Sequence, residues 1–263
     1  MSGTSGAKNP QRVKRGSQAV AQRVLGFERY LHLFALYKVR TLHLDRFESD
    51  VLLFARVMPP DAVVLDIGAN IGVMTTHLAR SVPRGHVHAF EPMPENHEAL
   101  NWVVGHYGLT NVTTHQIALG NTCGELEMVM PEQGSLRMQG LSRVLGADGQ
   151  YPSGHKSLVH QERLDSLDFL DGLDVSGIKI DVEDFEEYVF EGGRDLIARC
   201  MPVVYTELGQ SDNRGRCMEF FEDLGYLVCV ADDGRIVLHV EGAHQKHNFF
   251  MMPPGHPDRP LLG

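Results

Sequence analysis

A glycine-rich turn after a short apolar run is the first feature of this chain that could do chemistry. The apolar run covers residues 62–67, and the pattern Asp-x-Gly-x-Asn-x-Gly covers residues 66–72 before a helical stretch. Glycines in such a turn let the backbone approach a bound ligand closely. A dinucleotide-binding turn needs glycine at the positions of Asn70 and Val73, so the pattern indicates a small ligand without a pyrophosphate.

An acidic residue follows the next predicted strand. This strand covers residues 86–90 and ends at Glu91, 19 residues beyond Gly72. In doubly wound folds an acid near this spacing binds ribose, and both hydroxyls of an adenosine ribose can donate to one carboxylate. A surface acid at a strand end is the alternative for Glu91, and the glycine turn one unit upstream favours the ribose interpretation.

Two charged residues share one face of a later predicted strand. The strand covers residues 177–180, and its period of two places Lys179 and Asp181 on the same face. Asp181 lies at the carboxyl end, where doubly wound sheets bind ligands, so we expect it to point into the crevice. Lys179 more often pairs with a carboxylate than acts as a base. Glu183 and Glu186 begin the next helix, where solvent and the helix dipole account for acids.

Several side chains are candidates for a general base. Asp181 and Glu207 are carboxylates at the ends of neighbouring strands. The histidines outside the expected core, His155, His160 and His247, are further candidates, although a lone histidine is more often structural or solvated. Asp181 and Glu207 could also share a Mg²⁺ ion, which prefers oxygen ligands. Two carboxylates are too few for a metal site, so we predict none.

The elements that carry these residues alternate between strand and helix. Short apolar runs are separated by segments of helix length, which predicts a doubly wound α/β fold with a mostly parallel sheet. The turn signal at residues 232–234 precedes strand-like segments too close for a crossover helix, so an antiparallel edge strand is expected. The predicted strands cover residues 62–67, 86–90, 112–118, 177–180, 202–206, 226–231, 235–240 and 248–252.

Three segments are expected along the chain. Residues 1–17 are polar with several glycines and are predicted to be a disordered basic arm. Apolar residues recur at helical spacing within residues 18–58, which predicts N-terminal helices, one of them over residues 18–40. Residues 59–263 form the main domain. Within it, residues 131–161 contain several glycines without periodicity, which predicts a loop that acts as a lid.

Composition narrows the class of protein. The chain has 263 residues, 43% of them hydrophobic, which suits one large soluble domain. No apolar run reaches the roughly 20 residues of a membrane span, and the N-terminus lacks the features of a signal peptide, so we expect a cytoplasmic protein. The four cysteines show no spacing typical of a zinc site or a disulfide framework.

Charge is distributed unevenly. The net charge is −10, but residues 1–46 carry +7, which leaves −17 for the remainder. The acidic body disfavours a nucleic-acid platform, because phosphates must be met by clustered Lys and Arg. We interpret the basic segment as solvated or docked on the body itself, with RNA or an anionic membrane as alternatives. The N-terminal helices could also join two copies into a homo-oligomer.

The segments described above resemble a known family. Over about residues 63–252, the residues, order and spacing of these segments are similar to those of the FkbM family of methyltransferases, which use S-adenosylmethionine (SAM). The resemblance implies a seven-stranded methyltransferase sheet and O-methyl transfer to natural-product, sugar or lipid-like hydroxyls. One departure is Asp184, where the family usually has glycine. The segments are VVLDIGANIG, HAFEPMPENHEAL, NVTTHQIALGNTCGELEM, ERLDSL, IKIDVEDFEEYVFEGG, VVYTEL and NFFMMP.

The resemblance also implies which residues bind the cofactor. It places the aminoacyl end of SAM at the glycine turn, the ribose at Glu91 and the adenine at an apolar slot after the third strand. Ordinary core packing is the alternative for Ile117 and Leu119. The implied cofactor residues are Asp66, Gly68, Ala69, Asn70, Gly72, Glu91, Ile117, Ala118 and Leu119.

Together these features predict a SAM-dependent O-methyltransferase that acts on a hydroxyl of a small molecule. The predicted catalytic residues are Asp181, Glu207 and Lys179. An RNA methyltransferase that uses the basic arm is one alternative, weakened because no Asn/Asp-Pro-Pro-Tyr tetrapeptide follows the fourth strand. A SAM-binding protein without catalysis, in which Asp184 marks the loss of a working loop, is another.

Overall fold

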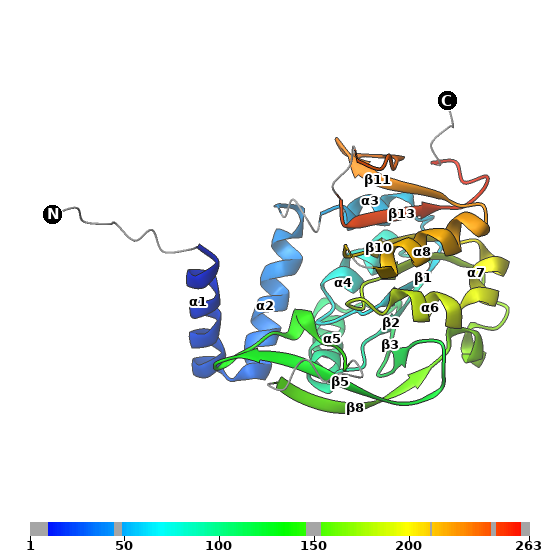
Figure 1. Cartoon of the computed structure of the whole chain (residues 1–263). Helices are drawn as coiled ribbons and strands as arrows, with labels where there is room; N and C mark the ends of the chain where they lie inside the picture. Colours follow the sequence, from blue (N-terminus) through cyan, green and yellow to red (C-terminus); the bar gives the residue numbers. More distant parts are fainter. Residues whose placement is uncertain (1–9, 45–48, 146–153, 211, 243–245, 259–263) are drawn as a thin grey trace.

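The computed structural model describes residues 10–44, 49–145, 154–210, 212–242 and 246–258, and its centre is an eight-stranded sheet (Figure 1). Five neighbouring strands run parallel, which confirms the doubly wound α/β prediction. From one edge to the other, the order is β3 (Val112–His115), β2 (His86–Phe90), β1 (Val63–Ile67), β9 (Val175–Ile180), β10 (Val203–Glu207), β13 (Asn248–Met252), β11 (Leu227–Asp232) and β12 (Arg235–Leu238).

The antiparallel part of the sheet is larger than a single edge strand. β13 lies between β10 and β11 and runs antiparallel to both, and β12 adds an antiparallel strand at the edge. The described sheet therefore has eight strands, whereas the family resemblance implied seven. The strand predicted over residues 235–240 is β12, which forms because Asp233 and Gly234 both adopt a positive φ and turn the chain back along β11.

Helices cover both faces of the sheet. Leu65 and Ile67 of β1 pack into a cluster with α6, α7 and α8, whereas Val64 packs with α3 and α4 on the opposite face. This burial on both faces is typical of a central parallel strand. The helices are α3 (Val51–Val57), α4 (Val73–Ser81), α5 (Pro94–Tyr107), α6 (Glu186–Gly192), α7 (Arg194–Cys200) and α8 (Asp212–Asp223).

Two helices and a short turn form the N-terminal part. α1 (Pro10–Leu25) and α2 (Phe27–Thr41) are separate because Gly26, with a φ of 79°, breaks the single helix predicted over residues 18–40; η1 (Leu42–Leu44) follows. The prediction of disorder is wrong for residues 10–17, which begin α1, and residues 1–9 lie outside the described part. α2 packs on α4 and α5, and α1 is the outer helix (Figure 1).

A long hairpin forms a second, smaller sheet below the main one (Figure 1). β5 (Gly124–Gln133) pairs antiparallel with β8 (Gly154–Glu162), and β8 also pairs with β4 (Ala118–Leu119). The short strands β6 (Leu136–Arg137) and β7 (Arg143–Val144) and the turn η2 (Gln139–Leu141) complete it. The expectation of a loop over residues 131–161 is therefore wrong where β5 and β8 run, and residues 146–153 lie outside the described part.

The N-terminal helices are attached to this hairpin. The Gln22 side chain donates to the Arg137 carbonyl at 3.0 Å and accepts from the Arg137 N–H at 2.9 Å. Gln22 is buried, so its amide replaces a missing strand at the open edge of β6.

None of the helices in the described ranges combines the length and apolar character that crossing a membrane requires.

Candidate functional site

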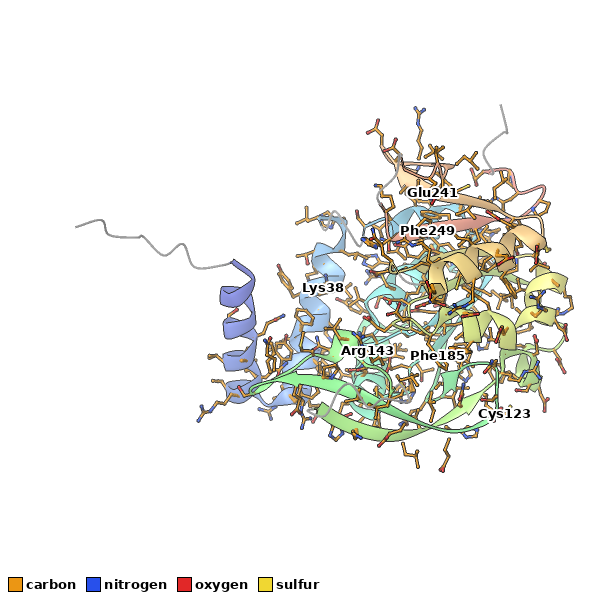
Figure 2. All side chains as sticks on the ribbon, viewed as in Figure 1. Lys38, Cys123, Arg143, Phe185, Glu241 and Phe249 are labelled. Atoms are coloured by element: carbon orange, nitrogen blue, oxygen red, sulfur yellow. The ribbon has the colours of Figure 1, made fainter. Side chains whose placement is uncertain are left out.

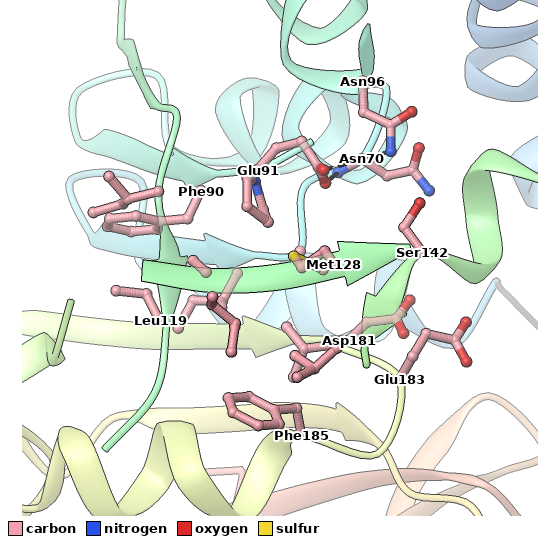
Figure 3. Close-up of a pocket in the computed structure, with 18 of the residues that line it drawn as sticks. Asn70, Phe90, Glu91, Asn96, Leu119, Met128, Ser142, Asp181, Glu183 and Phe185 are labelled. Carbon is pink, nitrogen blue, oxygen red and sulfur yellow. Dashed lines mark hydrogen bonds between the residues drawn. The ribbon is translucent and has the colours of Figure 1, made fainter. Parts of the chain in front are cut away.

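A pocket lies at the carboxyl ends of β1, β2 and β9 (Figure 3). It contains about 650 Å³ of empty space, counting the part open to solvent. The main sheet and its turns form one wall, and the β5 hairpin forms the other. The first wall consists of Ile67, Gly68, Asn70, Phe90, Glu91, Pro92, Asn96, Ile117, Ala118, Leu119, Asp181, Val182, Glu183 and Phe185.

The glycine turn forms one corner of the pocket. Gly68 has a φ of 73°, and a Cβ built on it would overlap the Asp181 carbonyl oxygen. Asn70, with a φ of 50°, also lines the pocket, and asparagine tolerates this left-handed backbone better than most residues. Ala69 and Gly72 do not line it. Gly72 instead begins α4 with a φ of 82°, against Leu100 of α5.

Asp66 and Lys179 lie beneath this turn rather than in the pocket. Asp66 is fully buried, accepts a hydrogen bond from the Thr75 hydroxyl at 2.6 Å, and lies 3.3 Å from the Lys179 ammonium. Lys179 also donates to the Gly68 carbonyl at 2.8 Å. Burial lowers the pKa of Lys179, but the charges of Asp66 and Asp181 outweigh it and leave the pKa raised. Lys179 is thus a charged residue that holds the turn.

Glu91 lies beside this corner, in the same wall of the pocket. Its side chain is 5% exposed, and its two carboxylate oxygens accept hydrogen bonds from the Asn70 and Met93 N–H groups, both at 2.9 Å. Burial raises the pKa of Glu91 to about 7, although these hydrogen bonds lower it. A buried carboxylate on a cavity wall can accept from ligand hydroxyls in a water-poor setting.

An apolar slot lies further along the same wall. Ile117, Ala118 and Leu119, which the family resemblance assigns to the adenine, line it together with Phe90. Ala118 and Leu119 are also buried, because β4 pairs with β8 at this point. Leu119 therefore packs in the core and also lines the pocket, so the two interpretations do not exclude each other.

The loop after β9 forms the other end of the pocket (Figure 3). Asp181 lines it, as predicted, beside Glu183, which the sequence analysis left as a helix-start acid. Glu183 and Asp184 have φ values of 53° and 68°, a left-handed backbone conformation that favours glycine. Burial and the Asp181 charge raise the pKa of Glu183 to about 7, and Arg143, 4.0 Å away, lowers it.

Glu186 does not match its predicted role as a solvated acid. It begins α6 as expected, but its side chain is 2% exposed. It accepts hydrogen bonds from the Val182 N–H at 3.2 Å and from the Asn213 amide at 2.7 Å. Burial raises the pKa of Glu186 to about 7. Glu186 therefore stabilises the loop that carries Glu183, through its hydrogen bond to the Val182 N–H.

The remaining candidate bases lie away from the pocket. Glu207 ends β10 but is not one of the residues that line the cavity. His155 lies 3.1 Å from Glu95, and His160 lies 2.6 Å from Glu162, both on the hairpin side. The remaining histidine, His247, lies beside Arg214. Within the described ranges, no group of three or more potential ligands is arranged to hold a metal ion.

The second wall of the pocket was not predicted from the sequence. This wall comes from the β5 hairpin, and Figure 2 shows Arg143 and Phe185 in the region between the hairpin and the main sheet. A signal was present, because Leu126 and Met128 alternate with Glu125 and Glu127, as in a strand. The lining residues of this wall are Leu126, Met128, Gln139, Gly140, Ser142 and Val144.

The doubly wound sheet, the glycine turn and the buried acid after β2 are the features of a SAM-dependent methyltransferase. A family profile described as "Methyltransferase FkbM domain" matches residues 66–228, more than half of the chain. The chain belongs to this family, the FkbM methyltransferases. The family membership expected from the sequence resemblance is therefore confirmed.

Individual relatives differ in how much they share with this chain. "Methyltransferase 1" of Beauveria bassiana is 26% identical over 222 residues, which cover 78% of this chain and 87% of the relative. The "AMB antimetabolite synthetase AmbE" of Pseudomonas aeruginosa is 49% identical over 51 residues, 19% of this chain and 2% of the synthetase. The crystal structure of a methyltransferase FkbM from Methylobacillus flagellatus shares the fold, with a TM-score of 0.54 and 15% identity, over 91% of this chain and 60% of that one.

Proposed function

We propose that this protein is an O-methyltransferase that transfers the methyl group of SAM to a hydroxyl of a small molecule. The observation that carries the proposal is the single pocket that joins the Gly68 and Glu91 corner to the carboxylates of Asp181 and Glu183. A methyl donor and an acceptor must meet in one water-poor space, and this pocket provides both ends of it.

The residues present suit SAM at the first end. Glu91 offers a buried carboxylate to the ribose, and the slot of Phe90, Ile117 and Leu119 offers apolar surface to the adenine. Asn70 has a buried Oδ1 without a hydrogen-bond partner in the described part of the chain, which suits the ammonium of the aminoacyl end. Asp66, Ala69 and Gly72 then act by shaping the turn.

The second end suits a neutral acceptor. When bound, SAM supplies an activated methyl group and its own leaving group. The chain must hold the hydroxyl in line, accept its proton and keep water out. We assign proton acceptance or orientation to Asp181, with Glu183 beside it. Lys179 acts only through the Gly68 turn, and Glu207 lies outside the lining.

The walls of the pocket favour a natural-product, sugar or lipid-like acceptor over RNA. Phe185, Met128 and Val144 supply apolar surface, and Ser142 supplies a polar contact. Carboxylates at this end would repel the phosphates of a nucleic acid. The short likeness to an antimetabolite synthetase also supports an acceptor from secondary metabolism.

The test is an acceptor screen with methyl-labelled SAM. Pools of alcohols and sugars, of amines, and of RNA are incubated separately with the protein, and mass spectrometry locates the transferred methyl group. We expect label on oxygen in the first pool, unchanged by a chelator that removes Mg²⁺. Label on RNA or on nitrogen would contradict the proposal, and SAM binding without transfer in any pool would favour a protein without catalysis.

A further inference from the structure

Asn96 is a buried polar residue in the pocket wall to which the sequence resemblance gives no role. It lies in the first turn of α5, which Pro94 begins, and its side chain is directed back toward Glu91 (Figure 3). Asn96 is 1% exposed and lines the pocket. A buried amide on a cavity wall needs partners for both of its ends.

The orientation of the Asn96 amide follows from its neighbours. Its Nδ2 lies 3.4 Å from the Glu91 Oε1 and 3.4 Å from the Gln139 carbonyl oxygen. A backbone carbonyl only accepts hydrogen bonds, so the NH₂ group must face it. The Oδ1 is then left buried, without a hydrogen-bond partner among the described residues. This atom is an acceptor that lacks a donor.

The hydrogen bonds of Glu91 show where that donor comes from. A carboxylate has about four lone-pair positions, two on each oxygen. Oε1 accepts from the Met93 N–H and the Asn96 Nδ2, and Oε2 accepts from the Asn70 N–H. One position remains, on Oε2. Glu91 can therefore accept from one ribose hydroxyl but not from two, although the sequence analysis assigned both to it.

We propose that Asn96 binds the cofactor ribose together with Glu91, each accepting a hydrogen bond from a different hydroxyl. The inference rests on the proposed SAM site and adds a residue to it. Both side chains line the same wall, and they are in contact through the Asn96 Nδ2 and the Glu91 Oε1. Two neighbouring hydroxyls on one ring need acceptors on neighbouring side chains, here the Asn96 Oδ1 and the Glu91 Oε2. Two separate acceptors also make the site sensitive to the loss of either hydroxyl.

Calorimetry with S-adenosylhomocysteine and its 2′-deoxy and 3′-deoxy analogues tests this in the full-length protein. For the wild type we expect each deoxy analogue to bind about tenfold more weakly than the parent compound, because each leaves one buried acceptor unpaired. Asn96→Ala should bind the parent compound about tenfold more weakly. Asn96→Ala should bind one of the two deoxy analogues as tightly as it binds the parent compound, because the hydroxyl that this analogue lacks has already lost its acceptor.

The matched control is Asn101→Ala, on the exposed part of the same helix, where Asn101 contacts only His97 and Thr114 among the hydrogen bonds assigned to it. Its affinity for all three ligands should equal that of the wild type. A wild type sensitive to only one hydroxyl would overturn the inference without any variant. The inference would also be overturned if Asn96→Ala bound both deoxy analogues more weakly than the parent compound, by the same factor as the wild type does.

Failure of the proposed cofactor site gives a different pattern. If wild-type protein binds none of the three ligands, the SAM assignment itself is wrong. If the wild type binds them and Glu91→Ala weakens binding while Asn96→Ala does not, only the role of Asn96 is wrong. A thermal melt of each variant shows whether the fold is retained.

Discussion

The two ends of the pocket are built in different ways. At the cofactor end, Gly68, Asn70 and Glu91 follow two adjacent parallel strands, and buried hydrogen bonds fix them to each other. At the acceptor end, Asp181 and Glu183 lie on a left-handed loop that faces a hairpin from a separate sheet. The first end depends on strand register, and the second depends on contacts between distant segments.

Under the proposed function, this difference separates substrate range from cofactor use. Glu91 and the glycine turn are set by the main sheet, and changes there affect both cofactor binding and the fold. The hairpin residues Met128, Ser142 and Val144 are held by β5, β7 and η2, outside that sheet. We therefore expect the cofactor end to tolerate little change and the acceptor end to tolerate more.

The largest effect is expected from a methyl group added at the cofactor end. In Gly68→Ala the new Cβ overlaps the Asp181 carbonyl oxygen at a φ of 73°, which should lower the free energy of unfolding by about 2 to 5 kcal/mol. In the matched control Gly140→Ala, on the hairpin wall, the nearest heavy atom lies 3.9 Å from the new Cβ. Urea denaturation should show almost no change for it, and equal losses in the two variants would contradict the comparison.

A pH-dependent effect is expected from Glu186, which braces the acceptor end. Its pKa is raised from 4.5 to about 7, so between those values the folded protein keeps a proton that the unfolded chain has released. Stability from this group is therefore present below pH 4.5 and is lost as the pH rises through 7, by about 3 kcal/mol at most.

The variant Glu186→Gln removes this titration. Relative to the wild type it should become more stable as the pH is raised from 4.5 to 8, measured by urea denaturation at each pH. Glu222→Gln, exposed on α8, is the control and should show no such trend. A difference between Glu186→Gln and the wild type that stays constant with pH would argue against a buried titrating group.

Catalysis should depend on a charge at the acceptor end. Asp181→Asn keeps the shape and removes the carboxylate, so turnover should fall by ~100-fold, the usual contribution of a general base. SAM affinity should change little. Glu207→Gln, at the end of the neighbouring strand but outside the lining, should retain turnover. A loss in the second variant without a loss in the first would show that the proton acceptor has been misassigned.

A smaller effect is expected where α1 meets the hairpin. Gln22→Met removes two hydrogen bonds to Arg137. Because each contributes about 1 kcal/mol net, amide exchange over residues 136–145 should become about tenfold faster. Exchange in β1 should not change, nor should exchange in the control Val24→Gln, where Val24 is 76% exposed. The predicted lid over residues 131–161 is tested in the same data, because exchange there should slow when SAM and acceptor bind.

The pocket end formed by Gly68, Asn70 and Glu91 could be predicted from sequence because its signals are local. Gly68, Asn70 and Glu91 each lie within a few residues of a strand end, and the order of strands brings those ends together. The strand and helix alternation predicted the parallel part of the sheet for the same reason. The strand β12 was also predicted, because the turn signal at residues 232–234 is local. The break at Gly26 depends on a single turn, which apolar periodicity does not resolve.

The acceptor end was predicted only in part because its contacts are between distant segments. Asp181 was placed correctly by its position at the end of β9. Glu186 was expected in solvent, but Asn213, 27 residues later on α8, covers it, and no pattern near Glu186 indicates that contact. The hairpin wall was taken for a loop because glycines and turns interrupt its short strands.

The most direct test of this account is calorimetry of S-adenosylhomocysteine with the wild type, Glu91→Ala and the exposed control Glu98→Ala on α5. The account predicts that the wild type and Glu98→Ala bind equally. Glu91→Ala should bind more weakly by about 1 to 3 kcal/mol, the cost of leaving a buried hydroxyl unpaired. Equal affinity in all three proteins would show that the cofactor does not lie against Glu91.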